Sequence, residues 1–149
     1  MERKQLLPGK FTTTDLIYIA GFFDGEGCIR IGKAYELTNR TYYYNLSVTI
    51  GNTDLDVLKY IHGVLGGALT KRAITKNRKD FYGIYWSGKW AKNILLLLLP
   101  YLRTKHKQAE LGIYFEDFVH VKGSRASGID KDLQEIFFQI SKSLKCQLT

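Results

Sequence analysis

Cysteine and proline are scarce in this chain, and no stretch is apolar for long enough to form a membrane helix. Its two cysteines, Cys28 and Cys146, lie far apart and form no C-x-x-C pair, which argues against a disulfide framework and a structural zinc site. The leucine run 95–99 is far shorter than the roughly 20 apolar residues of a membrane span. The N-terminus lacks the apolar core of a signal peptide. We therefore expect a soluble, intracellular protein with reduced thiols.

Acidic residues are the minority, since 14 Asp and Glu stand against 22 Lys and Arg, which gives a net charge of +8. Such an excess favours a polyanionic partner. With 45% apolar residues and no interval that resembles a linker, residues 1–149 are expected to form one domain, with a polar arm over 1–13 and a loop and helix over 122–149. Many basic residues fall in segments that resemble strands and their loops: Arg30, Lys33, Arg40, Lys71, Arg72, Lys76, Arg78 and Lys79.

Hydrophobic periodicity predicts an α+β fold. Apolar residues at helical spacing predict a helix over about 16–24, with Thr14 or Asp15 as its N-cap. Period-two alternation predicts strands over 28–37 and 42–50. The later pattern predicts a helix that begins near 52–54 and ends at Gly66, followed by strands over 68–75 and 81–87 that are joined by a basic turn over 76–80. It then predicts a helical region from about 90 to 119, interrupted at Pro100, and a final amphipathic helix after a loop over 122–128.

The segment 19–28, I-A-G-F-F-D-G-E-G-C, joins the first helix directly to a carboxylate at its end. Gly21 lies inside the helix, where glycine costs about 1 kcal/mol relative to alanine, so a close approach of another element is expected there. Gly25 and Gly27 predict a sharp turn that aims the Glu26 side chain beyond the helix. The same residues also fit an amphipathic core helix with a glycine-rich C-terminal cap.

Residues 19–27 resemble the signature of the LAGLIDADG homing endonucleases, with Ile for Leu at the first position and Glu26 where the family more often has Asp. The resemblance implies a curved four-stranded antiparallel sheet with helices on one face, in the order αββαββα plus a C-terminal helix, lying in the DNA major groove. It also implies that Glu26 binds the divalent metal, Mg²⁺ or Mn²⁺, with the Gly25 carbonyl as a further ligand. Two carboxylates in a basic environment suit such hard cations.

The chain carries one copy of this signature, and the family requires two, so the resemblance implies a homodimer. Small residues on the first helix, Ala20 and Gly21, together with Asp24, are expected at the pairing surface, where they would bring two Glu26 side chains together. The other partner available to this helix is its own sheet. Closed two-fold pairing is the commonest form of oligomer, which favours the dimer.

Two further catalytic candidates rest on the resemblance. The segment 99–109, L-P-Y-L-R-T-K-H-K-Q-A, is similar to one that carries a catalytic lysine in single-motif members, which indicates Lys105. A cation there would stabilise charge on the phosphate, although a basic run also fits a solvated face. Asn52 matches a polar residue that orders water in the family, although it also fits a cap of the following helix. No histidine shows triad or ligand spacing, so water is the expected nucleophile.

Side chains opposite the apolar ones in each strand are the candidates for reading DNA: Arg30, Gly32, Tyr43, Asn45, Ser47, Thr49, Thr70 and Arg72. Arginine suits guanine and asparagine suits adenine in the major groove. Strands of six to eight residues span about 20–26 Å. A dimer would therefore read a long, nearly palindromic site of about two helical turns.

Together with the resemblance, these observations predict a homodimeric, metal-dependent homing endonuclease that hydrolyses both strands of double-stranded DNA. The alternatives are an intron RNA maturase or a DNA-binding regulator on the same fold that no longer cuts. A generic basic RNA-binding domain would make the signature coincidental, and the chain lacks a clear RNP, KH or zinc pattern.

Overall fold

The computed structural model describes residues 11–72, 76, 78–122 and 128–146. Outside this range lie most of the predicted N-terminal arm (1–10), the end of the third predicted strand (73–75), most of the predicted loop (123–127) and the last residues (147–149). The elements, in order, are α1 (Thr13–Glu26), β1 (Gly27–Glu36), β2 (Thr41–Asn52), α2 (Leu55–Leu65), β3 (Ala68–Arg72), β4 (Phe81–Ser87), α3 (Gly88–Leu98), the 3-10 helix η1 (Leu99–Tyr101), α4 (His106–Lys122) and α5 (Gly128–Cys146). The predicted α+β order is confirmed.

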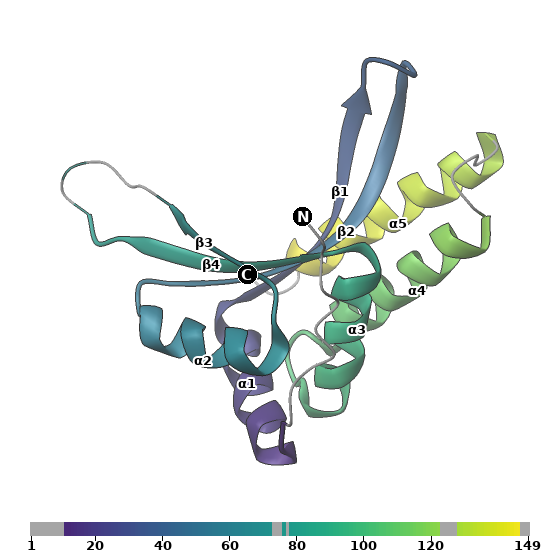
Figure 1. Ribbon diagram of the computed structural model, residues 1–149. Helices are drawn as coiled ribbons and strands as arrows, with labels where there is room; N and C mark the ends of the chain where they lie inside the picture. Colours follow the sequence, from purple (N-terminus) through teal and green to yellow (C-terminus); the bar gives the residue numbers. More distant parts are fainter. Residues whose placement is uncertain (1–10, 73–75, 77, 123–127, 147–149) are drawn as a thin grey trace.

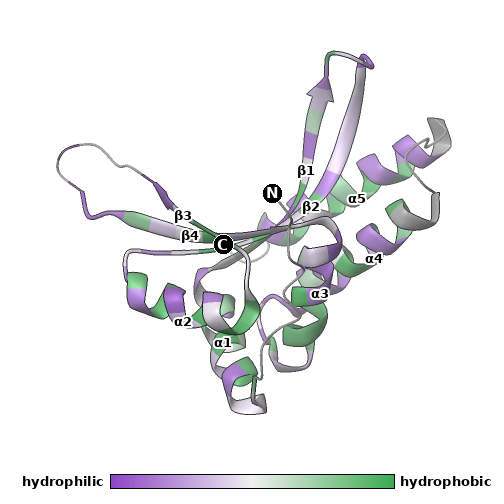
Figure 2. Ribbon diagram, in the orientation of Figure 1, coloured by the Kyte–Doolittle hydropathy of each residue, from purple (hydrophilic) through white to green (hydrophobic). Residues whose placement is uncertain are grey.

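The four strands form one antiparallel sheet in the order β1-β2-β4-β3. The helices gather on one face of this sheet, and the β1–β2 and β3–β4 hairpins extend from it in different directions (Figure 1). The opposite face carries no helix among the described elements. Hydrophobic residues are concentrated in the helices below the sheet, α3 in particular, whereas the outer part of β2 is mainly hydrophilic (Figure 2). One face of the sheet is therefore open, and antiparallel sheets commonly tolerate such a solvated face.

Strand alternation places the core on the helix side. In register, Ile29 lies opposite Val48 and Ile31 opposite Leu46, and all four side chains are buried. Burying one such side chain contributes about 1.5–3 kcal/mol. The other fully buried large side chains of this core are Phe23, Ile19, Ile50, Leu58, Ile61, Leu65, Ile84, Trp86, Leu95, Leu98 and Phe115.

Helix α1 is longer than the sequence predicts at both ends. Its N-cap is Thr12, whose Oγ1 accepts the Asp15 N–H at 3.2 Å while the Asp15 carboxylate accepts the Thr12 N–H at 2.8 Å. This reciprocal capping box replaces the predicted cap at Thr14 or Asp15, and Asp15 is instead the third residue of the helix.

None of the helices within the described ranges is long and apolar enough to span a membrane.

The predicted sharp turn after Asp24 is wrong. Helix α1 continues through Gly25 to Glu26, and Gly27 has an ordinary extended backbone with φ −78° and ψ 155°. Gly27 is required for packing instead, because a Cβ there would lie 2.3 Å from Cδ2 of Phe23. The chain thus passes directly from helix to strand, and Glu26 is the last helical residue.

Candidate active site and nucleic-acid interface

Glu26 lies at the junction between α1 and the edge strand β1. The next residue, Gly27, is opposite Ile50 of β2, so the end of α1 is fixed to the sheet by strand pairing. The Glu26 side chain is exposed, and among the described residues it has no hydrogen-bond or ion-pair partner. It borders a hollow of about 470 Å³ that is lined by residues of β2, β3 and β4: Thr49, Ile50, Gly51, Ala68, Thr70, Arg72, Phe81, Gly83, Ile84 and Tyr85.

Asp24, the other acid of the signature, is fully engaged within the chain. Its carboxylate accepts the backbone N–H of Arg103 at 2.8 Å and that of Lys105 at 3.1 Å. Partial burial raises the pKa of Asp24, but these two hydrogen bonds and those from Thr104 outweigh it, so its pKa lies below 3.8. The two acids therefore differ in role, because Asp24 fixes a loop and Glu26 is open to a ligand.

The same loop brings Lys105 to the end of α1. The Lys105 Nζ donates a hydrogen bond to the Asp24 carbonyl, and the Thr104 Oγ1 donates to the same oxygen at 3.4 Å. Lys105 is partly buried, whereas Arg103 and Lys107 of the same basic run are exposed. The Lys105 ammonium is thus held at the end of α1 by the carbonyl of Asp24, which is two residues before Glu26 in that helix.

Asn52, the third catalytic candidate, has a local partner. Its Oδ1 accepts the Asp54 N–H at 2.8 Å, and Asp54 is the N-cap of α2, accepting the N–H groups of Asp56 at 3.0 Å and Val57 at 3.3 Å. Asn52 therefore orients the cap residue rather than capping α2 itself. It does not line the hollow beside Glu26, and its catalytic role stays a prediction.

The candidate DNA-reading residues fall into distinct groups on the open face. Arg30, Tyr43 and Asn45 are exposed on β1 and β2. Thr49, Thr70 and Arg72 line the same hollow as Glu26.

Two of the candidates present little or no side chain. Ser47 is 9% exposed, and its Oγ donates to the Arg30 carbonyl at 3.5 Å. Gly32 is buried opposite Asn45, and a Cβ there would lie 2.7 Å from the Asn45 Oδ1. Gly32 therefore makes room for Asn45 and Ser47 supports Arg30, which corrects their prediction as surface contacts.

Two aromatic residues of the hollow, Phe81 and Tyr85, are absent from the sequence prediction. Both line the hollow, and Tyr85 is 41% exposed. The signal was available, because Ile84 and Trp86 are the apolar members of the alternation in β4 and so place 81, 83 and 85 on the opposite face.

The exposed side of α1 carries two glycines one helical turn apart, Gly21 and Gly25. A Cβ added at either would find no atom of the chain within 4 Å. Ile17 and Tyr18 of the same helix are 53% and 52% exposed. Ala20, by contrast, is fully buried in the chain's own core, so its prediction as a pairing-surface residue is wrong.

A hard divalent cation fits the donor atoms at the end of α1. The Glu26 carboxylate supplies a charged oxygen with no competing partner in the described chain, and carboxylate and carbonyl oxygens are the ligands that Mg²⁺ prefers. Among the described residues there is no group of three or more His, Cys, Asp or Glu side chains that could hold a metal ion. A cation at Glu26 would need ligands from outside this chain, such as a second Glu26, water or phosphate oxygens.

The sequence profile of a family described as LAGLIDADG endonuclease matches residues 19–121. No significant match to a curated protein sequence is found. Among solved structures, the homing endonuclease I-CvuI bound to DNA in the presence of Mg is 22% identical with a TM-score of 0.74, covering 89% of this chain and 85% of that one. The archaeal intron-encoded endonuclease I-Vdi141I bound to DNA is 15% identical with a TM-score of 0.67, covering 88% and 84%. The endonuclease I-GzeII bound to its DNA target is 14% identical with a TM-score of 0.67, covering 85% of this chain but 43% of that one.

Proposed function

Because the chain belongs to the LAGLIDADG endonuclease family, we propose that it is a homodimeric, metal-dependent endonuclease that cuts both strands of a long, nearly palindromic DNA site. One observation carries this proposal. An unpartnered carboxylate, Glu26, stands at the edge of the open sheet face, while the same helix end holds the cation of Lys105. A carboxylate and a cation beside a basic, open sheet are the parts that phosphodiester hydrolysis requires.

The open face supplies the chemistry for binding DNA. Arg30 and Arg72 are exposed and offer forked donors suited to guanine edges or phosphates, and Asn45 suits adenine. Thr49 and Thr70 add hydroxyls beside the hollow, and Tyr85 adds an aromatic ring with a polar end. The net charge of +8 favours association with a polyanion and makes binding depend on salt.

The chemistry of cleavage is assigned to the end of α1. Glu26 and the Gly25 carbonyl would hold Mg²⁺ or Mn²⁺, which when bound polarises the phosphoryl oxygen and lowers the pKa of the attacking water. The Lys105 ammonium stabilises negative charge that develops at the phosphate. Asp24 keeps Lys105 in place by accepting its backbone N–H. No side chain of the chain is assigned as the nucleophile.

Pairing through α1 completes the active site in this proposal. Gly21 and Gly25 each lower helix stability by about 1 kcal/mol relative to alanine, and nothing within the described chain occupies the space they leave. A second α1 packed across a two-fold axis would use that space and bring two Glu26 residues together. The fold spans most of the I-CvuI chain but less than half of I-GzeII, as expected if longer chains carry two such units.

The test is a selection for bound sequences from a randomised duplex library, followed by cleavage of the enriched duplex with Mg²⁺, Ca²⁺ or EDTA. We expect enrichment of one nearly palindromic sequence, double-strand cleavage in Mg²⁺, and binding with little or no cleavage in Ca²⁺. Full cleavage in EDTA would contradict the metal mechanism. Binding without cleavage in Mg²⁺ would identify a non-cutting regulator instead.

A further inference from the structure

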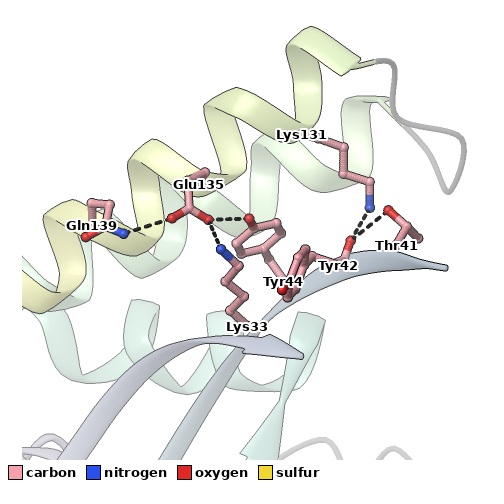
Figure 3. Close-up of polar contacts among 7 residues, drawn as sticks. All are labelled: Lys33, Thr41, Tyr42, Tyr44, Lys131, Glu135 and Gln139. Carbon is pink, nitrogen blue, oxygen red and sulfur yellow. Dashed lines mark hydrogen bonds and ion pairs between the residues drawn. The ribbon is translucent and has the colours of Figure 1, made fainter. Parts of the chain in front are cut away.

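The C-terminal helix α5 is joined to the β1–β2 hairpin by a polar cluster made of Lys33, Tyr44, Glu135 and Gln139, called here the Glu135 cluster (Figure 3). The Glu135 Oε2 accepts hydrogen bonds from the Lys33 Nζ at 2.7 Å and from the Tyr44 hydroxyl. The Glu135 Oε1 accepts one from the Gln139 Nε2 at 2.8 Å. The Oε2 atom therefore joins the helix to the hairpin, whereas the Oε1 hydrogen bond stays within α5, because Gln139 lies one helical turn further along the same helix.

Lys33 and Tyr44 are the members of one cross-strand pair. They continue the helix-side face of β1 and β2 directly beyond the apolar pair Ile31 and Leu46. The fully buried part of the hydrophobic core thus ends at that pair. Beyond it, Tyr44 is only partly buried against the core, and Glu135 attaches the hairpin to a helix. The side chains of Lys33 and Glu135 are 27% and 33% exposed, so the contact is partly shielded from water.

Neighbouring contacts extend the attachment along one side of α5. The Lys131 Nζ, one helical turn before Glu135, donates to the Tyr42 carbonyl at 2.8 Å (Figure 3). The Phe138 ring packs edge-on against Tyr44 with centroids 6.2 Å apart. Each of these contacts reaches the part of the hairpin beyond the core.

The opposite face of this same part of the hairpin carries candidate DNA-reading residues. Tyr43 and Asn45 flank Tyr44 in β2, and Gly32, which makes room for Asn45, precedes Lys33 in β1. Side chains of successive strand residues point to opposite faces of a sheet. Tyr44 therefore contacts Glu135 on the helix side, while its neighbours Tyr43 and Asn45 face the open side. A shift of the hairpin at Lys33 or Tyr44 must move both reading side chains.

We infer that Glu135 is a positioning residue that sets the angle of the β1–β2 hairpin and thereby the sequence specificity at the outer base pairs of each half-site. The inference rests on the proposed function, because it assumes that the open face reads DNA. Inner base pairs, next to the hollow at Glu26, are contacted from the part of the sheet that the apolar core supports. Their recognition does not depend on Glu135.

The first experiment needs no DNA and compares amide hydrogen exchange in the wild-type protein, Glu135→Ala, Glu135→Gln and Asp132→Asn. Asp132 is exposed on the same helix, so Asp132→Asn removes the same charge without touching the cluster. We expect exchange in residues 33–36 and 41–45 to become roughly 3- to 10-fold faster in Glu135→Ala, less so in Glu135→Gln, and unchanged in the control. Strand β4 serves as the internal reference. Unchanged exchange in Glu135→Ala would overturn the inference.

The second experiment repeats the selection from a randomised duplex library with the same variants. Glu135→Ala should lose roughly tenfold of its discrimination at outer base pairs and keep the wild-type preference at inner ones. A loss spread evenly over all positions would indicate a general structural role and overturn the inference. An unchanged profile would overturn it as well. Failure of the wild-type protein to enrich any sequence would overturn the proposed function, a result that the exchange measurement distinguishes from failure of the cluster.

Discussion

Asp24 accepts the backbone N–H of Lys105 at 3.1 Å, and the Lys105 Nζ in turn donates to the Asp24 carbonyl. The pair joins the end of α1 to the segment before α4, across 81 positions of sequence. It gives the first acid of the signature a role that differs from metal binding, namely holding the Lys105 cation at the end of α1, the helix that ends at Glu26.

Replacing Asp24 with Asn should therefore affect both stability and rate. Asn can accept only one of the two backbone N–H groups well and loses the charge, so we expect a loss of about 1–2 kcal/mol in the free energy of unfolding. Cleavage should slow because Lys105 is less well placed. Urea unfolding and single-turnover cleavage would measure the two effects. Asp80→Asn, which removes only an exposed ion pair with Lys71, is the matched control and should change neither by much.

Lys105→Met should slow cleavage by about 10²-fold or more while changing DNA affinity little, because a cation at the active site acts on charge that develops in the transition state. The measurements are single-turnover rates and equilibrium binding in Ca²⁺. Lys107→Met removes an exposed charge from the same basic run and should affect only binding. Equal losses of affinity in both variants, with the rate unaltered, would assign Lys105 to the solvated surface.

Much of the fold could be predicted because its strands alternate so regularly. Ile29 and Ile31, and likewise Leu46, Val48 and Ile50, are buried on the helix side, as their spacing indicated. The helix ends were less predictable. The cap at Thr12 depends on reciprocal hydrogen bonds with Asp15, and the need for glycine at position 27 depends on where the Phe23 ring lies. Neither contact can be deduced from the sequence alone.

The site could be predicted only in part, because its assembly depends on contacts between distant segments. Ala20 and Gly21 look alike as small residues of one helix, yet Ala20 faces the core and Gly21 faces outward. The Glu135 cluster joins residues 91 and 102 positions apart. One signal was present, since Lys33 and Tyr44 are polar side chains at positions where the alternation requires the helix-side face.

Gly21→Leu tests pairing through α1 without disturbing the fold. A side chain at this position meets no atom of its own chain, and leucine favours helix by about 0.5–1 kcal/mol over glycine, so the isolated chain should be at least as stable. The dimer should be lost, as measured by analytical ultracentrifugation. Gly63→Leu, at an equally open position on α2, is the control and should keep the dimer. A dimer that persists in Gly21→Leu would place the pairing surface elsewhere.

The Glu135 cluster predicts a defined dependence of stability on pH. Hydrogen bonds from Lys33 first, then from Tyr44 and Gln139, lower the pKa of Glu135 from 4.5 to about 2. Because the folded pKa is depressed, the ionised carboxylate stabilises the folded state fully above 4.5, and this contribution is lost as pH falls toward 2. The difference in unfolding free energy between wild type and Glu135→Gln should therefore shrink over that window. A difference that stays constant with pH would contradict the ionised contact.

Glu26→Gln tests chemistry and assembly together. Glutamine keeps the size of the side chain but removes the charge that would hold the metal, so the variant homodimer should bind the selected DNA and fail to cut it. If each chain supplies one carboxylate at a shared two-fold axis, a mixed dimer of wild-type and Glu26→Gln chains should lose double-strand cleavage and leave nicking or very slow cutting. The measurement is single-turnover cleavage of a supercoiled plasmid by a purified heterodimer with different tags on its chains. Undiminished linearisation by the mixed dimer would show that the two chains act independently, and a fully active Glu26→Gln homodimer would remove Glu26 from the active site.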